Sequence, residues 1–337
     1  MHNKFTNISD KALISTLMEQ VSNINVRVME DPLPDIQYPN LVPVNTNYSP
    51  WQQSAVSITF NNGVGVAKWI TTYSKDVPLV EVGASTSQIT FAEFSMGWET
   101  NIGEVGMAAG VGFNIPDVKA RIVRRKAEEF IDSVTLTGVT PDDDDSKGFT
   151  GLINKAGITP IPASTKANGG TNWVNNDGTL NATPQEIAAD LVSLILGPVS
   201  LTNTVRPIPA DTLALPSMAY RALAGTFTDA LNGSISYLEW IRRQIAAVPG
   251  GSSFTIVEIP ELSTAATTVI PGGGRVIAYR RTLDVLELPM PMPFQFLNEY
   301  KDGPFGYMIP GLGRFGELQI REPRAFRYMD GVLPVPA

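Results

Sequence analysis

The sequence contains no cysteine and a single histidine, His2, at the start of the chain. Cysteine–histidine dyads, serine–histidine–acid triads, zinc sites, iron–sulfur clusters and disulfides all need residue types that are missing here. Only carboxylate, lysine, tyrosine or backbone chemistry would remain. We therefore predict that the protein is not an enzyme and has no catalytic, cofactor-binding or metal-binding residues.

Long apolar runs and an excess of basic residues are also missing. The longest strongly apolar run, residues 191–196, is too short to cross a bilayer, and residues 1–10 show no secretory signal. We expect no association with a membrane. We also expect the protein to be synthesised in the cytoplasm. The formal net charge of −8 argues against bulk affinity for nucleic acid, because lysine and arginine drive phosphate binding. It does not exclude proximity to DNA.

The first 50 residues are predicted to form an arm and an extended connector. Only residues 11–21 could form a short helix. Five prolines then deny backbone donors and fix the chain as non-helical: Pro32, Pro34, Pro39, Pro43 and Pro50. A segment of this kind, which cannot pack on itself, is expected to lie along another surface.

From Ala55 the pattern changes to the alternation that is typical of strands. Val56, Ile58 and Phe60 alternate with smaller residues, and the pattern resumes after the turn signal at residues 61–63 with Val64, Val66, Lys68 and Ile70. A further strand is predicted at residues 88–98, with large apolar groups on both sides. The polar residues 74–87 are interpreted as the tip of a long hairpin.

The clearest helix is predicted over residues 117–136, after an apolar patch of small residues at 105–112. Pro116 suits the helix start, Gly138 suits its end, and apolar residues recur at helical spacing, namely Val123, Ala127, Phe130 and Val134. A Gly/Asn/Thr-rich loop up to Thr183 is expected on the surface. At Thr183 a capping box opens another helix with an apolar face of Ile187, Leu191, Leu194 and Ile195.

The remaining chain mixes helices and strands. Helices are predicted at 218–227, capped by Ser217, and at 235–247, and strands at 212–215, 254–259, 275–281, 283–288 and 318–320. Because no strict βαβ rhythm is present, the predicted class is α+β.

Two motifs could bind ions. The four aspartates at 142–145 could hold Ca²⁺ or Mg²⁺, but calcium sites need alternating ligands, so we favour a solvated turn after the helix. Gly272-Gly273-Gly274-Arg275 could bind phosphate, but no Gly-Lys-Ser/Thr follows and a strand comes next. We interpret this glycine run as a hairpin turn.

Two groups of basic residues could have other roles. The helix cations Arg121, Arg124, Arg125 and Lys126 could contact nucleic acid, but we favour salt bridges between subunits or segments. Lys68 and Lys75 could in principle form a covalent bond to an asparagine of another subunit. This chemistry needs a desolvated lysine beside a carboxylate, which spacing cannot show.

The order of these elements resembles one protein family. The stretch Gly148-Phe149-Thr150-Gly151-Leu152-Ile153-Asn154 after the long helix, and the ending from Gln319 to Gly331, are similar to those of tailed-bacteriophage major capsid proteins. These proteins have the Hong Kong-type coat fold, which they share with encapsulins. The resemblance covers nearly the whole chain as an architecture, whereas the short motifs are only moderately specific.

The resemblance implies five regions. They are an N-terminal arm (1–54), an extended β-hairpin loop (55–98), a peripheral domain with a spine helix (99–160), an axial domain (161–285) and a return to the peripheral sheet (286–337).

The function implied is a virion coat protein that forms hexamers and pentamers and closes into an icosahedral shell around double-stranded DNA. Such a shell would assemble in the host cytoplasm, and a scaffold, a portal and decoration proteins are open as partners. An encapsulin-like compartment around a cargo enzyme is the alternative. A carboxylate-based hydrolase or a carbohydrate-binding protein is a third hypothesis, which would need a pocket.

Overall fold

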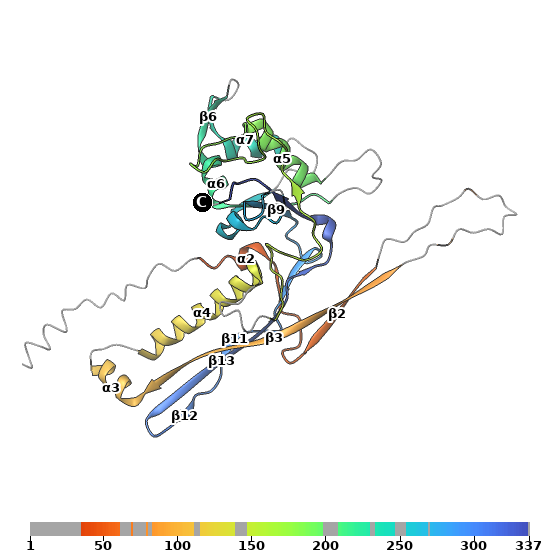
Figure 1. The fold of residues 1–337 in the computed structure, drawn as a ribbon. Coiled ribbons are helices and arrows are strands. Elements are labelled where there is room, and N and C mark those ends of the chain that lie inside the picture. The colour runs from red at the N-terminus through yellow and green to blue at the C-terminus, as the bar shows by residue number, and fades with distance from the viewer. Residues whose placement is uncertain are drawn as a thin grey trace, which may run out of the picture. The chain divides into compact units, whose positions relative to one another are not determined.

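The computed structural model describes residues 35–60, 69, 79, 83–110, 115–138, 147–197, 208–229, 233–246, 254–268 and 270–335 (Figure 1). The chain divides into two compact units, and each is built from separated stretches. The smaller contains residues 1–36, 94–129 and 294–313, and the larger contains 37–93, 130–293 and 314–337. Helices and sheets occur together, which confirms the predicted α+β class.

The larger unit is built around a mixed five-stranded sheet with the order β4-β15-β9-β5-β8. Its strands are β4 (Ile161–Pro162), β5 (Thr212–Leu215), β8 (Thr255–Glu258), β9 (Arg275–Tyr279) and β15 (Phe326–Asp330). Every residue of β5, β9 and β15 is buried. This pattern is expected of central strands that are covered on both faces.

Three helices share a hydrophobic core with this sheet: α5 (Pro184–Leu196), α6 (Ser217–Ala224) and α7 (Tyr237–Ala246). The predicted capping box is confirmed, because the Thr183 hydroxyl accepts from the Glu186 N–H and the Glu186 carboxylate accepts from the Thr183 N–H. The predicted helix at 218–227 needs correction at both ends. Ser217 is the first residue of α6 and not its cap, and Phe227 lies in β6 (Thr226–Asp229), which pairs with β7 (Gly233–Ser236).

A smaller sheet ties the beginning of the described chain to its end. Its order is β1-β10-β14, with β1 (Val44–Asn45), β10 (Leu286–Pro289) and β14 (Gln319–Ile320). Just before β1, the chain forms the one-turn helix α2 (Tyr38–Leu41), although its prolines predicted a non-helical segment. Pro39 is accommodated because it occupies the first turn, where a backbone donor is not needed.

The predicted long hairpin is confirmed at its base. Strand β2 (Ser54–Phe60) pairs antiparallel with β3 (Ala84–Asn101), from Ser54 opposite Thr90 to Phe60 opposite Ala84. Residues 84–87 therefore belong to a strand and not to the predicted tip. The predicted strand residues Val64, Val66, Lys68 and Ile70, and the predicted helix at 11–21, lie outside the described residues.

Strands β2 and β3 belong to a five-stranded sheet of order β11-β13-β3-β2, in which β12 also pairs with β13. The new strands are β11 (Met292–Phe296), β12 (Tyr300–Asp302) and β13 (Gly306–Gly316). The prediction that the 88–98 strand has apolar partners on both sides is confirmed by ring contacts. Phe91 contacts Tyr48, Phe94 stacks on Phe294, and Trp98 meets Phe296 edge-on.

The predicted long helix is α4 (Ile115–Thr137), and it extends slightly beyond both predicted ends. Val123, Ala127 and Val134 are buried as predicted. The apolar patch before it is the helix α3 (Ile102–Gly110), which the small residues did not reveal. Among the described residues, no helix is both long and apolar enough to span a membrane.

Two further predictions were wrong. The loop before Thr183 is not confined to the surface, because Trp173 and Val174 are fully buried. The turn at residues 272–274 does not close a hairpin, since it follows the 3₁₀ helix η2 (Pro260–Thr264) and leads into β9, whose neighbours are β15 and β5. A second 3₁₀ turn, η3 (Pro323–Ala325), precedes β15.

Candidate functional site

The glycine motif after α4 folds back onto the end of that helix. Gly138 ends α4 with a φ of 75°, and a Cβ atom there would lie 2.2 Å from the carbonyl oxygen of Phe149. A Cβ on Gly151 would lie 2.3 Å from the carbonyl oxygen of Leu136. Both distances are shorter than any allowed contact, so only glycine permits this approach.

Hydrogen bonds from the motif satisfy carbonyl groups that the helix end leaves open. The donors and acceptors are Leu152 N to Thr135 O (2.8 Å), Ile153 N to Leu136 O (3.0 Å) and Asn154 Nδ2 to Thr137 O (2.8 Å). The Asn154 side chain also accepts from the Gly151 N–H at 2.8 Å. The motif is thus a capping structure that fixes the direction in which the chain leaves α4.

A buried ion pair holds this junction against the central sheet. The Arg275 guanidinium donates to both carboxylate oxygens of Asp330, at 2.6 and 2.9 Å, and to the Ile153 carbonyl at 2.8 Å. The side chains of Arg275 and Asp330 are 2% and 0% exposed. Burial raises the pKa of Asp330, but hydrogen bonds from Arg275 and from two backbone N–H groups more than offset it, so the pKa is lowered.

Tyr328 of β15 joins the junction through its hydroxyl group. This group donates to the Leu152 carbonyl at 2.7 Å and accepts from the Lys155 N–H at 2.9 Å. Its ring lies under the Arg275 guanidinium at 4.4 Å, and burial raises the pKa of Tyr328. The two sequence stretches that carry the family resemblance therefore contact each other.

Arg327, the neighbour of Tyr328, caps the C-terminal end of helix α5 with its side chain. Its guanidinium donates to the carbonyl oxygens of Leu194 (3.1 Å) and Ile195 (3.0 Å) at the end of α5 and to that of Ile208 (2.8 Å). A cation is favourable at this position, because the carbonyl end of a helix carries partial negative charge.

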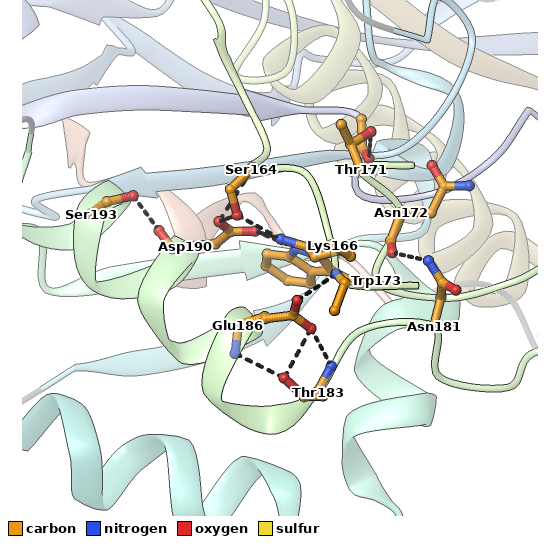
Figure 2. A network of polar contacts seen from close by, with 12 residues as sticks. Ser164, Lys166, Thr171, Asn172, Trp173, Asn181, Thr183, Glu186, Asp190 and Ser193 are labelled. Carbon is orange, nitrogen blue, oxygen red and sulfur yellow. Dashed lines mark hydrogen bonds and ion pairs between the residues drawn. The ribbon is translucent and has the colours of Figure 1, made fainter. Parts of the chain in front are cut away.

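A buried polar cluster fixes the loop before α5 (Figure 2). Asp190 of α5 accepts hydrogen bonds from the Lys166 ammonium, the Trp173 indole N–H (2.8 Å) and the Ser164 hydroxyl. The Lys166 and Asp190 side chains are 0% and 4% exposed. These buried hydrogen bonds to Asp190 hold the loop against α5, which explains why the loop is not confined to the surface.

Side chains from several elements bind residues 37–50 to the rest of the larger unit. Asp132 of α4 accepts from the N–H groups of Gln37 (3.0 Å) and Tyr38 (2.7 Å), and burial raises its pKa. Three carbonyl oxygens of the segment accept from Tyr279 (to Leu41, 2.9 Å), Arg281 (to Pro39, 2.7 Å) and Arg314 (to Pro50, 2.6 Å). Within the described residues, the connector thus lies along its own chain.

Glu287 of β10 completes this attachment. Its buried carboxylate accepts from Arg321 (2.6 Å), Asn45 (2.9 Å) and Tyr48 (3.0 Å), so β1 and the residue that follows β14 are bonded to the same group. Desolvation, followed by the charge of Glu287, raises the pKa of Tyr48.

Apolar side chains of the hairpin base are exposed. Val56 and Ile58, which share one face of β2, are 63% and 55% exposed, and Trp51 just before the strand is 69% exposed. β2 ends its sheet, and no described strand pairs with its outer edge. Exposed apolar groups beside an open strand edge are typical of a surface that another chain covers.

The candidate sites predicted from the sequence are placed only in part. Outside the described residues lie 142–145, Lys68, Lys75 and His2. Within the described residues, no group of three side chains that could bind a metal ion is found. Gly272-Gly273-Gly274 leads into Arg275, whose guanidinium binds Asp330.

The helix cations pair within this chain. Arg125 and Lys126 both bind Glu129 of the same helix, at 3.3 and 2.7 Å, and Arg124 lies over the Phe296 ring.

Sequence reasoning missed the buried charges Arg275, Asp330, Lys166 and Asp190. The available signal was weak: an arginine at the start of a strand and an aspartate at the end of another.

The architecture has the fold of phage-type capsid proteins. The capsid of Myoviridae phage XM1 matches with a TM-score of 0.68 at 15% identity, over 89% of this chain and 93% of that chain. The capsid of an empty GTA particle, computed with C5 symmetry, matches with a TM-score of 0.54 at 12% identity, over 89% and 91%. A chain of Mycobacterium phage Ogopogo matches with a TM-score of 0.50 at 10% identity, over 88% and 91%.

No match was found among curated protein sequences. The family model described as major capsid protein, however, matches residues 65–332, and this chain belongs to that family. It is a structural protein of phage-type capsids, which are shells made from many copies of one chain.

Proposed function

We propose that this chain assembles as hexamers and pentamers into a closed icosahedral shell that encloses the double-stranded DNA of a tailed phage. The match of the major capsid protein family over residues 65–332 carries this proposal. The net charge of −8 supports a wall that encloses DNA without sequence-specific binding, because it offers no basic excess to hold phosphates. On this proposal the chain performs no catalysis and assembles in the host cytoplasm.

The proposal assigns the five regions as follows. Residues 1–54 act as the arm, 55–98 as the extended loop, 99–160 as the peripheral domain with α4 as the spine helix, 161–285 as the axial domain, and 286–337 as the return to the peripheral sheet. The exposed Val56 and Ile58 of β2 support the second assignment, because a neighbouring subunit would cover them. A scaffold, a portal and decoration proteins would be further partners.

Electron microscopy of the purified protein tests the proposal. We expect closed particles of uniform size, and particles from infected or induced cells should contain DNA that resists nuclease until the shell is opened. If only small oligomers form across salt conditions and with any co-expressed scaffold, the shell proposal is wrong. Shells that contain a cargo enzyme in place of DNA would favour the encapsulin-like alternative.

A further inference from the structure

Two carboxylates bind the connector, and they differ in their charge partners. Glu287 accepts from the Arg321 guanidinium at 2.6 Å, so its negative charge is compensated. Asp132 of α4 accepts at its Oδ1 atom from the N–H groups of Gln37 (3.0 Å) and Tyr38 (2.7 Å). Within the part of the chain that the structure describes, no lysine or arginine stabilises the charge of Asp132. Only backbone dipoles therefore oppose this charge.

The surroundings of Asp132 add negative charge. Glu261 of η2 lies close enough for its charge to act on Asp132. The Oε1 atom of Gln37 is buried and has no hydrogen-bond partner among the described residues, so this attachment also has an acceptor without a donor. Further charged groups near the attachment are Glu128 and Glu129 one turn earlier on α4, Asp35 before Gln37, and Arg281, which donates to the Pro39 carbonyl.

The protonation of Asp132 is linked to the attachment. Burial raises the pKa of Asp132 and the charge of Glu261 adds to this, and together they outweigh the two hydrogen bonds, which lower the pKa. The attached carboxyl thus binds a proton more tightly than a free one, whose pKa is 3.8. By linkage, proton uptake favours the attached state. The cost of the charge is complete above the raised pKa and disappears below pH 3.8.

We propose that Asp132 makes the attachment of the connector sensitive to protons: the neutral carboxyl holds the start of the connector firmly, and the ionised carboxylate holds it weakly. The other side chains that bind the connector do not provide this response. Tyr279, Arg281 and Arg314 donate from groups that keep their protons at neutral pH, and Glu287 has its arginine partner. This inference concerns the single subunit and does not depend on the proposed shell.

Hydrogen exchange of the soluble subunits tests the proposal, with mass spectrometry over residues 37–45 and correction for the intrinsic rate at each pH. The variant D132N keeps the acceptor oxygen and removes the charge. At about pH 7 the exchange of this stretch should therefore slow about three- to tenfold. The difference should shrink toward about pH 4, because the unmodified carboxyl then takes up its own proton.

The matched control is D177N. Asp177 also accepts a backbone N–H, from Thr179 at 2.9 Å, but it lies on an exposed loop. Its substitution should leave the exchange of residues 37–45 unchanged at both pH values. A change as large as that of D132N would contradict the proposal, because the effect would not depend on the buried charge.

A second measurement needs no variant. In the unmodified chain, the protection of residues 37–45 relative to that of β9 should rise as the pH falls from about 7 to about 4. Circular dichroism shows whether D132N folds. If D132N folds and residues 37–45 exchange as fast as in the unmodified chain or faster at about pH 7, the proposal is wrong. A constant ratio of protection in the unmodified chain would also overturn it.

Discussion

Buried charges at single positions explain much of how this chain is held together. Arg275 forms a bidentate pair with Asp330 and reaches the junction after α4 through the Ile153 carbonyl. In the interior, the loss of one partner leaves the other charge without compensation, which costs far more than the pair itself contributes. At the exposed Arg243–Glu239 pair of α7 the same change leaves a charge that water solvates.

Arg275→Met should therefore lower the free energy of unfolding by about 3–5 kcal/mol. The matched control Arg243→Ala should lower it by about 1 kcal/mol or less. The double variant R275M/D330N should lose less than R275M alone, because it leaves no unpaired buried charge. Urea unfolding of the soluble subunits measures all three. Equal losses for R275M and R243A would contradict this account.

The lowered pKa of Asp330 predicts how stability responds to acid. In the unfolded chain this carboxyl has a pKa near 3.8, and in the folded chain the pKa is lower. The unfolded state therefore binds the proton first as the pH falls, so the contribution of Asp330 is present above pH 3.8 and is lost below it. The stability difference between the unmodified chain and D330N should shrink between roughly pH 5 and pH 2. Urea titrations across this range would show a constant difference if the prediction were wrong.

Individual buried polar residues were the least predictable part of the molecule. Lys166, Trp173 and Asp190 meet although the chain between them was interpreted as a surface loop. Lys166 and Asp190 would suit solvated positions equally well, and only the tertiary fold brings the three together. Thr183 and Glu186 were predictable because their contact is local, within one turn of the chain.

Among the elements, the β2–β3 hairpin leaves Val56 and Ile58 of its base exposed. Phe60 and Ala84 are direct partners in the ladder, so residues 61–83 connect two positions that already face each other. Trp69 and Leu79 of this connection are 105% and 83% exposed. The connection can therefore be removed without disturbing the register of the hairpin.

Replacing residues 61–83 by Asn-Gly should give folded, soluble subunits that do not close into particles. A two-residue Asn-Gly turn suits an antiparallel pair, so the larger unit should keep its stability. Circular dichroism and unfolding check the fold, and electron microscopy checks assembly. Normal particles from this variant would show that the hairpin connection has no role in the shell.

Elements with strong local signals were predicted well. The helix α4 has regular apolar spacing, a proline near its start and a glycine at its end, and the predicted range differs from the observed one by only a few residues. The helix α3 was missed because Gly103, Gly106 and Gly110 weaken helical propensity. The predicted helix at 218–227 was too long because β6 begins at Thr226 and pairs with β7, a contact that local spacing does not reveal.

For the molecule as a whole, the order of elements predicted the α+β class, and together with the motifs at 148–154 and 319–331 it predicted the capsid family. The division into two units was not predictable, because the smaller unit combines residues 94–129 with residues 294–313. No change of composition marks the positions at which the chain passes from one unit to the other. Packing decides them, and packing depends on which distant strands pair.

The place of β15 in the central sheet has a consequence for synthesis. It lies between β4 and β9, and it supplies Arg327, Tyr328 and Asp330 to the caps and ion pair described above. While the ribosome is still translating earlier residues, β9 lacks a neighbour on one side and Arg275 lacks its partner. The sheet can therefore be completed only after residue 330 has emerged, which delays native folding, and with it any association through finished surfaces, until translation of this region has ended.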